Sequence, residues 1–599
     1  MNTGLITRTE KPVVWRRLTV VAMLLLAFSG LVWRAIDLQL NHKEFLQTEG
    51  NARYLRVMKV PAHRGKILDR NGYPLAISTP VDSVWANPHE LRPGGTRFNR
   101  LVKLLGLDGR QLRRELKARK DREFVFLKRQ LDPALAQRVM ALGIDGIYLQ
   151  REYRRYYPLG EVAAHVVGFT NVDDLGQEGI ELAFEDLLGG TSGSKRVLRD
   201  RTGQTVADVE PIRSPKAGRD LVLSLDKRIQ YLAYRSLLAA VKHNRARAGS
   251  AVVLDALSGE VLAMVNQPSY NPNNRPDRVG SRFRNRAITD VFEPGSTAKP
   301  FTIAAALGSG RFDTDSLVDT APGYLKVGKY LVKDIRNHGK IDLGTIVQKS
   351  SNVGASKIAL ALPPEELWQT FSRFGFGQES GAGFPGEAAG VLNHYFEWGD
   401  VHKATLSYGY GISVTALQLA RAYAAIANNG RLPRVTFRAV NGTAQATSII
   451  SEEVSLKLRR MLEMVVTSGG TGTRAQLDGY RVAGKTGTVR KVTPSGYSED
   501  RYVALFAGMA PMSSPRIVTV VVIDEPAAGD YYGGQVAAPA FAEITQGALR
   551  LLGVAPDDRS LPLRQATATV PSRSVMERIQ SALAQMTLPR DRRAPETTR

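Results

Sequence analysis

The most apolar part of the chain lies near its N-terminus. Residues 18–33 (LTVVAMLLLAFSGLVW) hold no charged side chain over 16 positions. A membrane-spanning helix needs about 20 apolar residues, and the run reaches that length if Arg34 extends its charge toward the interface. We therefore predict an uncleaved transmembrane anchor over residues 18–38. A cleavable signal peptide is the main alternative, although no small-x-small cleavage site follows, and a buried core helix is the other.

Basic residues flank this run unevenly, and the asymmetry predicts its orientation. Four of them precede the run and two follow it closely: Arg8, Lys11, Arg16 and Arg17, then Arg34 and Lys43. Basic flanks tend to stay in the cytoplasm. Residues 1–17 are therefore predicted to be a cytoplasmic tail, and everything after about residue 40 is predicted to lie outside.

Beyond the anchor, short segments with strand and helix periodicity predict an exported α+β body. Strand-like runs occupy residues 220–225, 251–257, 260–265, 501–507 and 517–523, and helical runs occupy 227–243 and 539–552. Because strands lie at both ends of a helix-rich middle, we expect one α+β domain over residues 216–557.

Turn-rich segments divide the rest of the chain. Residues 41–215 contain a turn at Asn71-Gly72, a Gly/Ser-rich loop at 189–194 and a linker, RSPKAG, at 213–218. We place a domain boundary at this linker, which gives a separate domain over residues 41–215. Residues 558–599 are rich in Pro, Arg, Thr and Ser and are predicted to be a mobile tail, with helical periodicity only at 574–586.

Composition excludes several classes of function. The chain has no cysteine, which removes disulfides, thiolate metal sites and cysteine nucleophiles. Its net charge of +24 favours anionic partners, including anionic lipid. Lys and Arg are spread along the chain, however, and no nucleic-acid-binding motif accompanies them. An exported body would also not meet DNA, so we predict no nucleic-acid partner.

The candidate chemistry begins with a serine and a lysine. Histidine is scarce, with 8 residues, and no G-x-S-x-G elbow is present, so a Ser-His-Asp triad is not indicated. A lysine three residues after a serine lies on the same helical face and can serve as the base. Three pairs fit this spacing: Ser192/Lys195, Ser224/Lys227 and Ser296/Lys299. Only Ser296 opens an apolar helix, whose N–H groups favour developing negative charge.

A second motif, Ser350-Ser351-Asn352, lies between two helical patterns. The hydroxyl of Ser350 and the amide of Asn352 can relay a proton and hold a substrate amide. Taken alone, the same segment is more typical of a helix N-cap, because Ser and Asn are preferred at that position.

A third motif, residues 485–488, lies in a strand-like run over residues 480–490. Lys485, Thr486 and Thr488 can bind a substrate carboxylate, and Gly487 allows another backbone to approach closely. The backbone N–H groups of Ser296 and Thr488 are the candidate oxyanion hole. The order S-x-x-K, S-x-N, K-T-G within one domain is typical of penicillin-interacting serine enzymes.

At these motifs the chain resembles the class B penicillin-binding proteins, and in particular their septal, cell-division branch. The resemblance extends over residues 15–552. It includes RGKILDRNG at 64–72, RRYYP at 154–158 and EGIE at 178–181, which are typical of the non-catalytic pedestal, and SSNVGASKI at 350–358 and SYGYGISVT at 407–415. It implies a transpeptidase domain with a central antiparallel sheet flanked by helices, preceded by a mixed α/β pedestal and one anchor.

The resemblance also implies a function. The family's members are serine-type D-Ala-D-Ala transpeptidases that cross-link peptidoglycan stem peptides, here at the septum. Neutral Lys299 would deprotonate Ser296, which would attack the D-Ala-D-Ala carbonyl. Ser350 would pass the proton to the leaving amine. Lys485, with Thr486 and Thr488, would hold the terminal carboxylate, and Asn352 the peptide amide.

The partners and location implied by the resemblance follow from this function. β-Lactams would acylate the same serine, and no metal or organic cofactor is implied. Protein partners would be a SEDS-type glycosyltransferase and other divisome proteins. The location would be the bacterial inner membrane, with the catalytic domain in the periplasm.

Several alternatives remain open. Within the superfamily they are an elongation-specific transpeptidase, although Asn352 favours the septal branch, and a D,D-carboxypeptidase. A class A β-lactamase is disfavoured because no glutamate between residues 352 and 485 is followed four residues later by Asn. A catalytically idle scaffold would be expected to lose a motif, and a β-lactam sensor would need several membrane spans.

Overall fold

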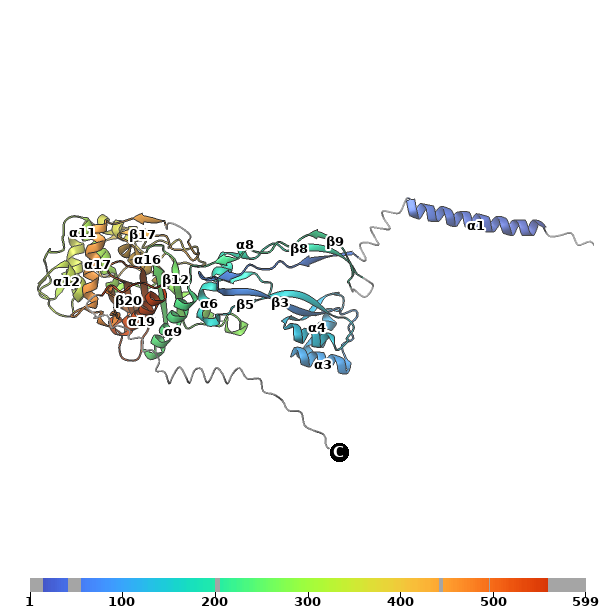
Figure 1. Cartoon of the computed structure of the whole chain (residues 1–599), viewed down its shortest axis with the longest axis horizontal. Helices are drawn as coiled ribbons and strands as arrows, with labels where there is room; N and C mark the ends of the chain where they lie inside the picture. Colours follow the sequence, from blue (N-terminus) through green and yellow to red (C-terminus); the bar gives the residue numbers. More distant parts are fainter. Residues whose placement is uncertain are drawn as a thin grey trace, which may run out of the picture.

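The computed structural model describes residues 14–40, 55–199, 205–278, 280–440, 445–494 and 496–558 (Figure 1). Most of the predicted cytoplasmic tail therefore lies outside the described residues. The same is true of the predicted C-terminal tail after Asp558, including its helical segment at 574–586.

The N-terminal apolar run forms one long helix, α1 (Val14–Leu40). Residues Trp15–Leu40 are long and apolar enough to cross a membrane, and none of their most apolar window is buried. Among the described residues, no other helix meets this criterion. The predicted anchor over residues 18–38 lies wholly within α1.

A five-stranded antiparallel sheet forms the centre of the C-terminal domain. Its strands, in spatial order, are β12 (Val261–Gln267), β11 (Ala248–Asp255), β21 (Ile517–Asp524), β20 (Gly496–Ala510) and β19 (Ala483–Thr493). Alternate residues of β21 face opposite cores, with Val520 on one side and Val521 on the other. Because both faces are covered, this strand is apolar on both sides, apart from the buried Thr519 and the terminal Asp524.

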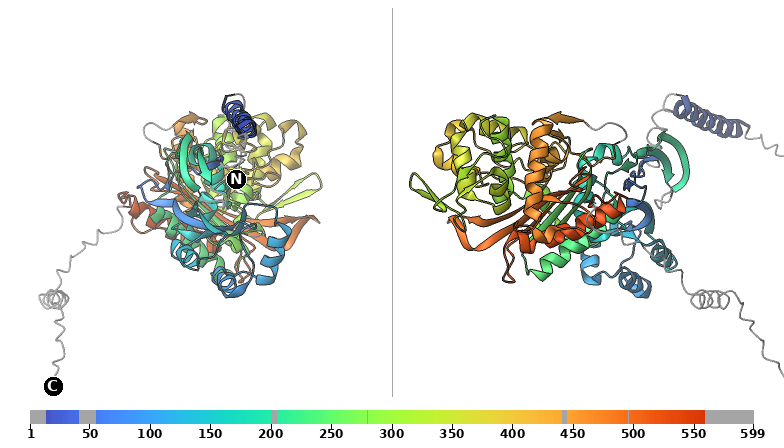
Figure 2. Two further views of the ribbon diagram at one scale, coloured as in Figure 1. Left: turned by 90° about the vertical axis from the view of Figure 1, so that its right-hand side faces the viewer. Right: turned by 60° about the vertical axis from the view of Figure 1, so that its left-hand side comes forward.

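Helices cover the two faces of this sheet (Figures 1 and 2). One face packs against α9 (Lys227–His243) and α19 (Ala538–Leu551). The other packs against a helical lobe that contains α11 (Lys299–Gly308), α12 (Leu343–Lys349), α13 (Asn352–Ala361), α16 (Ala416–Ala427) and α17 (Glu452–Val466). Helix α11 is buried from Lys299 to Leu307, so any polar group on it needs a partner.

The pedestal is built on one long strand, β3 (Pro74–Ala86), which pairs with β4 (Val125–Leu131) and β5 (Ile147–Tyr156). We call α3 (Gly95–Leu105), α4 (Gly109–Ala118) and α5 (Pro133–Met140) the head lobe, together with the strand ends that they cover. A second sheet contains β1 (Leu55–Val60), β8 (Gly193–Arg199) and β9 (Thr205–Arg213), in that order.

The three pedestal segments that resemble the family converge in a buried ion-pair network. Glu181 is fully buried and accepts hydrogen bonds from Arg64 Nε at 2.7 Å and from Arg155 Nε at 2.6 Å. Each guanidinium thus meets a carboxylate that solvent does not reach. Removing Glu181 alone would leave the buried Arg155 without its carboxylate and Arg64 with Glu185 alone, at 2.8 Å, which is strongly destabilising.

The same region joins the pedestal to the catalytic domain. The Lys227 N–H at the start of α9 donates to Asp69 at 3.1 Å, and Asn71 Nδ2 donates to Asp226 at 3.1 Å. Next to these contacts, β10 (Leu221–Val222) pairs in parallel with β2 (Ile67–Leu68) through main-chain hydrogen bonds. The segment that contains the Asn71-Gly72 turn is therefore hydrogen-bonded to the start of α9, the first helix of the catalytic domain.

Element boundaries differ from the sequence predictions where tertiary pairing decides them. The strand predicted over 220–225 shrinks to β10, and the loop predicted over 189–194 ends at Ser192 because Gly193 begins β8. Pairing with β20 carries β19 on to Thr493 instead of Arg490. At the C-terminus, the Asp558 N–H still donates to the carbonyl of Gly479 at 3.0 Å, so the packed part of the chain includes Asp558.

Candidate active site

Ser296 lies on a 3-10 turn, η4 (Gly295–Ala298), which leads directly into α11. The prediction that Ser296 opens the α-helix itself was wrong by three residues, because the tighter turn comes first. Lys299 has helical backbone angles of −53° and −38° although a proline follows it. Pro300 occupies the first turn of α11, where a missing N–H matters least. Lys299 Nζ lies 2.9 Å from Ser296 Oγ.

The second motif serves both as a helix cap and as part of the site. Ser351 is the N-cap of α13, and its hydroxyl accepts from the Gly354 N–H at 2.9 Å. Ser350, in the left-handed conformation with φ 61°, ends α12. This arrangement brings Ser350 Oγ to 3.0 Å from Ser296 Oγ and Asn352 Oδ1 to 2.7 Å from Lys299 Nζ. Ser351 therefore caps the helix, while its neighbours Ser350 and Asn352 belong to the site.

Lys485, on the edge strand β19, completes the cluster. Its Nζ donates to Ser350 Oγ at 3.0 Å and to the Thr486 carbonyl at 3.2 Å. Ser350 Oγ thus lies within hydrogen-bond distance of both lysines, since Lys299 Nζ is 3.1 Å away. Three motifs that are far apart in sequence meet at one hydroxyl.

Burial changes the protonation of both lysines. Lys299 and Lys485 are fully buried. Desolvation, together with the nearby Lys485 charge, holds the pKa of Lys299 well below its usual range, while Asp334 opposes this shift. Desolvation lowers the pKa of Lys485 to about 7. Burial therefore favours the uncharged form of Lys299, which is the form that can accept the Ser296 proton.

β19 passes so close to the Ser296 turn that glycines are required. A Cβ on Gly487 would lie 3.0 Å from Thr297 Cγ2 and 3.1 Å from the Pro294 carbonyl oxygen. Gly295, with φ +52°, would place a Cβ 2.5 Å from Val489 Cγ2. The strand carrying Thr488 and the turn carrying Ser296 are thereby held against each other. The Ser296 N–H belongs to the first turn, where no intrahelical acceptor is available.

The two threonine hydroxyls of the third motif are oriented by partners that the sequence analysis missed. Thr488 Oγ1 accepts from the Gly533 N–H at 2.9 Å, and Thr486 Oγ1 lies 2.8 Å from Thr471 Oγ1. An acceptor bond to Thr488 leaves its hydroxyl hydrogen available for a ligand. Gly533 and Thr471 carry no motif, and only the fold brings them here.

Asp334 is the main functional candidate that the sequence analysis missed. Its carboxylate accepts from Ser351 Oγ at 2.5 Å, from the Asn352 N–H at 2.5 Å and from the Val353 N–H at 3.0 Å. Asp334 directly follows β15 (Tyr330–Lys333), so it ties this strand to the start of α13. A lone aspartate in a loop gives no sequence signal for that role.

Replacing Asp334 with alanine is expected to slow acylation by a β-lactam about 10- to 100-fold, because the start of α13 loses three hydrogen bonds to a charged acceptor. Asp334→Asn keeps an oxygen acceptor in place and should retain most of the rate. Both variants should shift the acid limb of the pH–rate profile to lower pH, since the Asp334 charge raises the pKa of Lys299. Stopped-flow acylation across pH measures both effects; equal losses in the two variants would argue against positioning by Asp334.

The other two Ser-x-x-Lys pairs are not part of this cluster. Ser224 is buried in the core, where its hydroxyl donates to the Val261 carbonyl at 2.8 Å. Ser192 lies in the pedestal, directly before β8. In the described ranges, no group of three or more His, Asp or Glu side chains is placed to hold a metal ion.

Comparison with known proteins shows the family to which this chain belongs. The penicillin-binding protein transpeptidase domain family matches residues 249–546, and the penicillin-binding protein dimerisation domain family matches residues 59–223. The probable peptidoglycan D,D-transpeptidase PenA of Neisseria meningitidis is 43% identical over 91% of this chain and 94% of its own length. The chain is a class B penicillin-binding protein of the PBP3 type.

Further relatives of this penicillin-binding protein include the peptidoglycan D,D-transpeptidase FtsI of Escherichia coli, 42% identical over 92% of this chain and 95% of that protein. The solved transpeptidase domain of Burkholderia pseudomallei penicillin-binding protein 3 is 44% identical, with a TM-score of 0.52, and covers 57% of this chain and 98% of its own. A peptidoglycan synthetase from Bifidobacterium adolescentis, 25% identical with a TM-score of 0.68, covers 85% of this chain and 98% of its own.

These matches confirm the expected fold class of this penicillin-binding protein: a transpeptidase domain with an antiparallel sheet between helices, a pedestal and one N-terminal apolar helix. Together with α1, they identify a single-pass membrane protein. The pedestal boundary between residues 215 and 216 stays a prediction, as do the roles of the individual site residues.

Proposed function

We propose that this penicillin-binding protein cross-links peptidoglycan stem peptides by D,D-transpeptidation, through an acyl-enzyme on Ser296. One observation carries the proposal: a fully buried lysine with a lowered pKa lies 2.9 Å from a serine hydroxyl, inside a cluster formed by all three motifs. A buried amine with a lowered pKa can serve as the general base for the serine.

Acylation then proceeds in balanced steps. Lys299 accepts the Ser296 proton while Ser296 Oγ attacks the carbonyl carbon of the penultimate D-Ala. The developing oxyanion is held by the N–H groups of Ser296 and Thr488. Ser350 lies 3.0 Å from Ser296 Oγ and 3.1 Å from Lys299 Nζ, a position from which it relays the proton to the leaving nitrogen. The C–N bond breaks and the terminal D-Ala departs as an amine.

Deacylation uses the same groups, with the serine and the amine exchanging roles. The amine of a second stem peptide attacks the ester carbon while Lys299 accepts the amine proton. The ester C–O bond then breaks, and the proton passes from Lys299 to Ser296 Oγ. Lys485, with Thr486 and Thr488, holds the donor carboxylate, and Asn352 holds the peptide amide. β-Lactams mimic the donor and acylate Ser296 by the same first step.

Lys485→Arg is expected to remove the alkaline limb of the acylation profile. Lys485 is the cationic clamp that holds the substrate carboxylate, and desolvation lowers its pKa to about 7. As the pH rises above that value, the wild-type clamp loses its charge, so acylation should fall about tenfold per pH unit. Arginine stays protonated throughout this range, although its different reach should lower the maximum rate. The pH dependence of kcat/KM tests this. Lys491→Arg on the same strand is the matched control, and an unchanged limb in Lys485→Arg would contradict the clamp.

The cellular part of the proposal places this activity at the septum, in the inner membrane, with residues 1–17 cytoplasmic and the catalytic domain periplasmic. Basic residues before α1 and in its first turn support this arrangement, as do the names of the relatives. A SEDS-type glycosyltransferase and other divisome proteins are the proposed partners. We also propose the division into a pedestal over 41–215 and a transpeptidase domain over 216–557.

Depletion of the protein in its own bacterium tests the septal role. Cells should grow into filaments, and the wild-type gene, but not a Ser296→Ala gene, should restore division. Cells that round up instead would assign the enzyme to elongation. Rescue by Ser296→Ala would show that the protein acts as a scaffold and not through its chemistry.

A further inference from the structure

A tyrosine that the proposed chemistry does not use is hydrogen-bonded to the main chain beside Ser296. Tyr423 lies in the middle of α16 and is fully buried, and its hydroxyl donates to the Thr297 carbonyl at 2.9 Å. Thr297 directly follows Ser296 in η4. The bond therefore links a helix of the core to the turn that holds the serine, across 126 residues of chain.

Packing alone does not require the Tyr423 hydroxyl. Its neighbours in α16 from Ala422 to Ala427 are all buried and apolar, and its ring packs edge-on against Phe301 with centroids 5.7 Å apart. A phenylalanine would fill the same space. Because burying a hydroxyl is unfavourable unless it is hydrogen-bonded, we attribute its presence to the bond with Thr297. Burial raises the pKa of Tyr423 well above its usual range, so the hydroxyl stays a donor.

The turn at Ser296 is not a regular α-helical turn. Pro300 has no N–H, so the Ser296 carbonyl lacks the bond that an α-helix would form to that residue. It accepts from the Lys299 N–H instead, in the shorter 3-10 pattern. Hydrogen bonds in that pattern have poorer geometry than those of an α-helix. Gly295, just before Ser296, has a left-handed φ of 52°. Contacts from elsewhere in the fold are therefore needed to hold the turn.

These contacts come from three sides. The Gly295 N–H donates to the Gly409 carbonyl at 3.1 Å, and β19 lies against the turn at Gly487. Tyr423 adds a hydrogen bond from the core side. The Ser296 N–H lies two peptide units before the carbonyl that Tyr423 binds, so its direction depends on how that segment is fixed. A misplacement of about 1 Å at a reacting group can cost about 100-fold in rate.

We propose that Tyr423 is a positioning residue for acylation. Its hydroxyl fixes the turn, which aligns Ser296 Oγ with Lys299 and the Ser296 N–H with the developing oxyanion. The inference rests on the proposed function, because it requires Ser296 to be the nucleophile. Tyr423 bonds to main chain, so it acts through the turn, and its loss should affect the chemical step rather than the binding of a β-lactam.

Tyr423→Phe tests the proposal because it keeps the ring and removes only the oxygen. Stopped-flow acylation of the full chain in detergent micelles by a chromogenic cephalosporin separates the acylation rate constant from the dissociation constant of the non-covalent complex. The rate constant is expected to fall about tenfold, with the dissociation constant within twofold of wild type. Introducing 4-aminophenylalanine at position 423 keeps a donor hydrogen there and should restore at least half of the rate.

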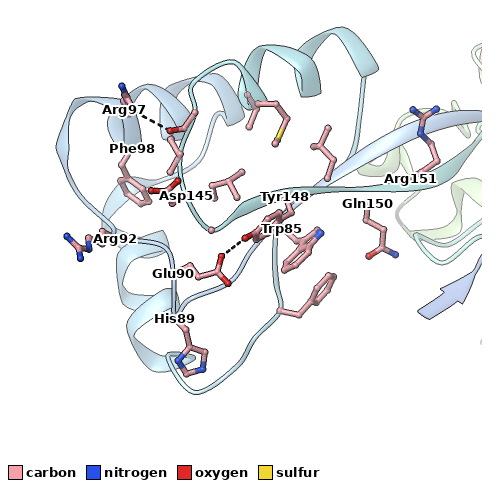
Figure 3. Close-up of a pocket in the computed structure, with 18 of the residues that line it drawn as sticks. Trp85, His89, Glu90, Arg92, Arg97, Phe98, Asp145, Tyr148, Gln150 and Arg151 are labelled. Atoms are coloured by element: carbon pink, nitrogen blue, oxygen red, sulfur yellow. Dashed lines mark hydrogen bonds between the residues drawn. The ribbon is translucent and has the colours of Figure 1, made fainter. Parts of the chain in front are cut away.

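Two other tyrosines provide matched controls. Tyr270 is also buried, and its hydroxyl donates to the Ala164 carbonyl at 3.0 Å, at the junction with the pedestal. Tyr148 lies in the head lobe, where its hydroxyl donates to Glu90 (Figure 3). Tyr270→Phe and Tyr148→Phe each lose one phenol hydrogen bond far from Ser296 in sequence, and both should acylate like wild type.

An aryl boronic acid supplies a readout that a purely structural role would not move. Its boron bonds to Ser296 Oγ and forms a tetrahedral adduct, which resembles the transition state. Affinity for this probe should fall in Tyr423→Phe by about the same factor as the rate constant, at a temperature well below the melting transition of each variant. An affinity equal to that of wild type would show that the hydroxyl only stabilises the core.

Other outcomes separate this inference from the proposed function. An acylation rate constant for Tyr423→Phe within twofold of wild type would overturn the inference, and so would an equal loss in Tyr270→Phe. A failure of 4-aminophenylalanine to restore the rate would also count against a donated hydrogen bond. A penicillin adduct that persists in Ser296→Ala would refute the proposed function itself, whatever the result at Tyr423.

Discussion

Replacing Ser296 with alanine is expected to abolish covalent labelling by a fluorescent penicillin. Removing an enzyme's nucleophile costs on the order of 10⁶-fold in rate, and Ser296 is the hydroxyl that lies within 3.0 Å of both Lys299 Nζ and Ser350 Oγ. Gel fluorescence and intact-mass analysis should show no adduct in the variant and a single adduct in wild type. An adduct that persists in Ser296→Ala would disprove the assignment.

The chain provides its own controls for this experiment. Ser224→Ala and Ser192→Ala remove the serines of the two other Ser-x-x-Lys pairs and should label like wild type. Ser224 donates to a core carbonyl, so its loss is expected to lower the free energy of unfolding by about 1 kcal/mol without affecting the acyl-enzyme. Thermal melting separates this loss of stability from a loss of chemistry.

The sequence predicted the parts of the site that are encoded by local order. The three motifs could be found because each holds its chemistry within four residues, and α11, α12, α13 and β19 carry them close to the predicted positions. Helices with a clear apolar face were predicted well: α9 spans the expected residues 227–243, and α19 lies within one residue of 539–552.

What the sequence could not predict depends on distant contacts. Asp334, Thr471 and Gly533 contact the motif residues only because the fold brings them together. None of the three lies in a sequence motif that would indicate its role.

Two buried lysines, Lys299 and Lys485, occupy the same site. Both are fully buried and both reach Ser350 Oγ, at 3.1 Å and 3.0 Å. Two charged amines this close would repel each other in a low-dielectric setting. The site therefore favours one neutral amine, Lys299, beside one that can carry a proton, Lys485. A base and a cationic clamp thus arise from the same residue type through their environment.

Lys299→Arg is expected to slow acylation by about 10²- to 10⁴-fold, the contribution of a general base. Arginine keeps the positive charge but remains protonated at every accessible pH. In wild type, the rate should rise as pH increases through the lowered pKa of Lys299, because only the uncharged amine accepts the Ser296 proton. Lys299→Arg should lack this acid limb, and the dependence of the acylation rate on pH would reveal it.

Lys485→Met extends the test to the coupling between the two lysines. The Lys485 charge lowers the pKa of Lys299, so its removal should raise that pKa and move the acid limb to higher pH. The variant also loses the cationic clamp, so its acylation rate falls at every pH. The pH at which the rate rises does not depend on the maximum rate, so it can still be compared with wild type. Lys491→Met, on the same strand and paired with Asp524, should leave the limb in place. An acid limb that stays fixed in Lys485→Met would assign it to a group other than Lys299 and remove the base from the mechanism.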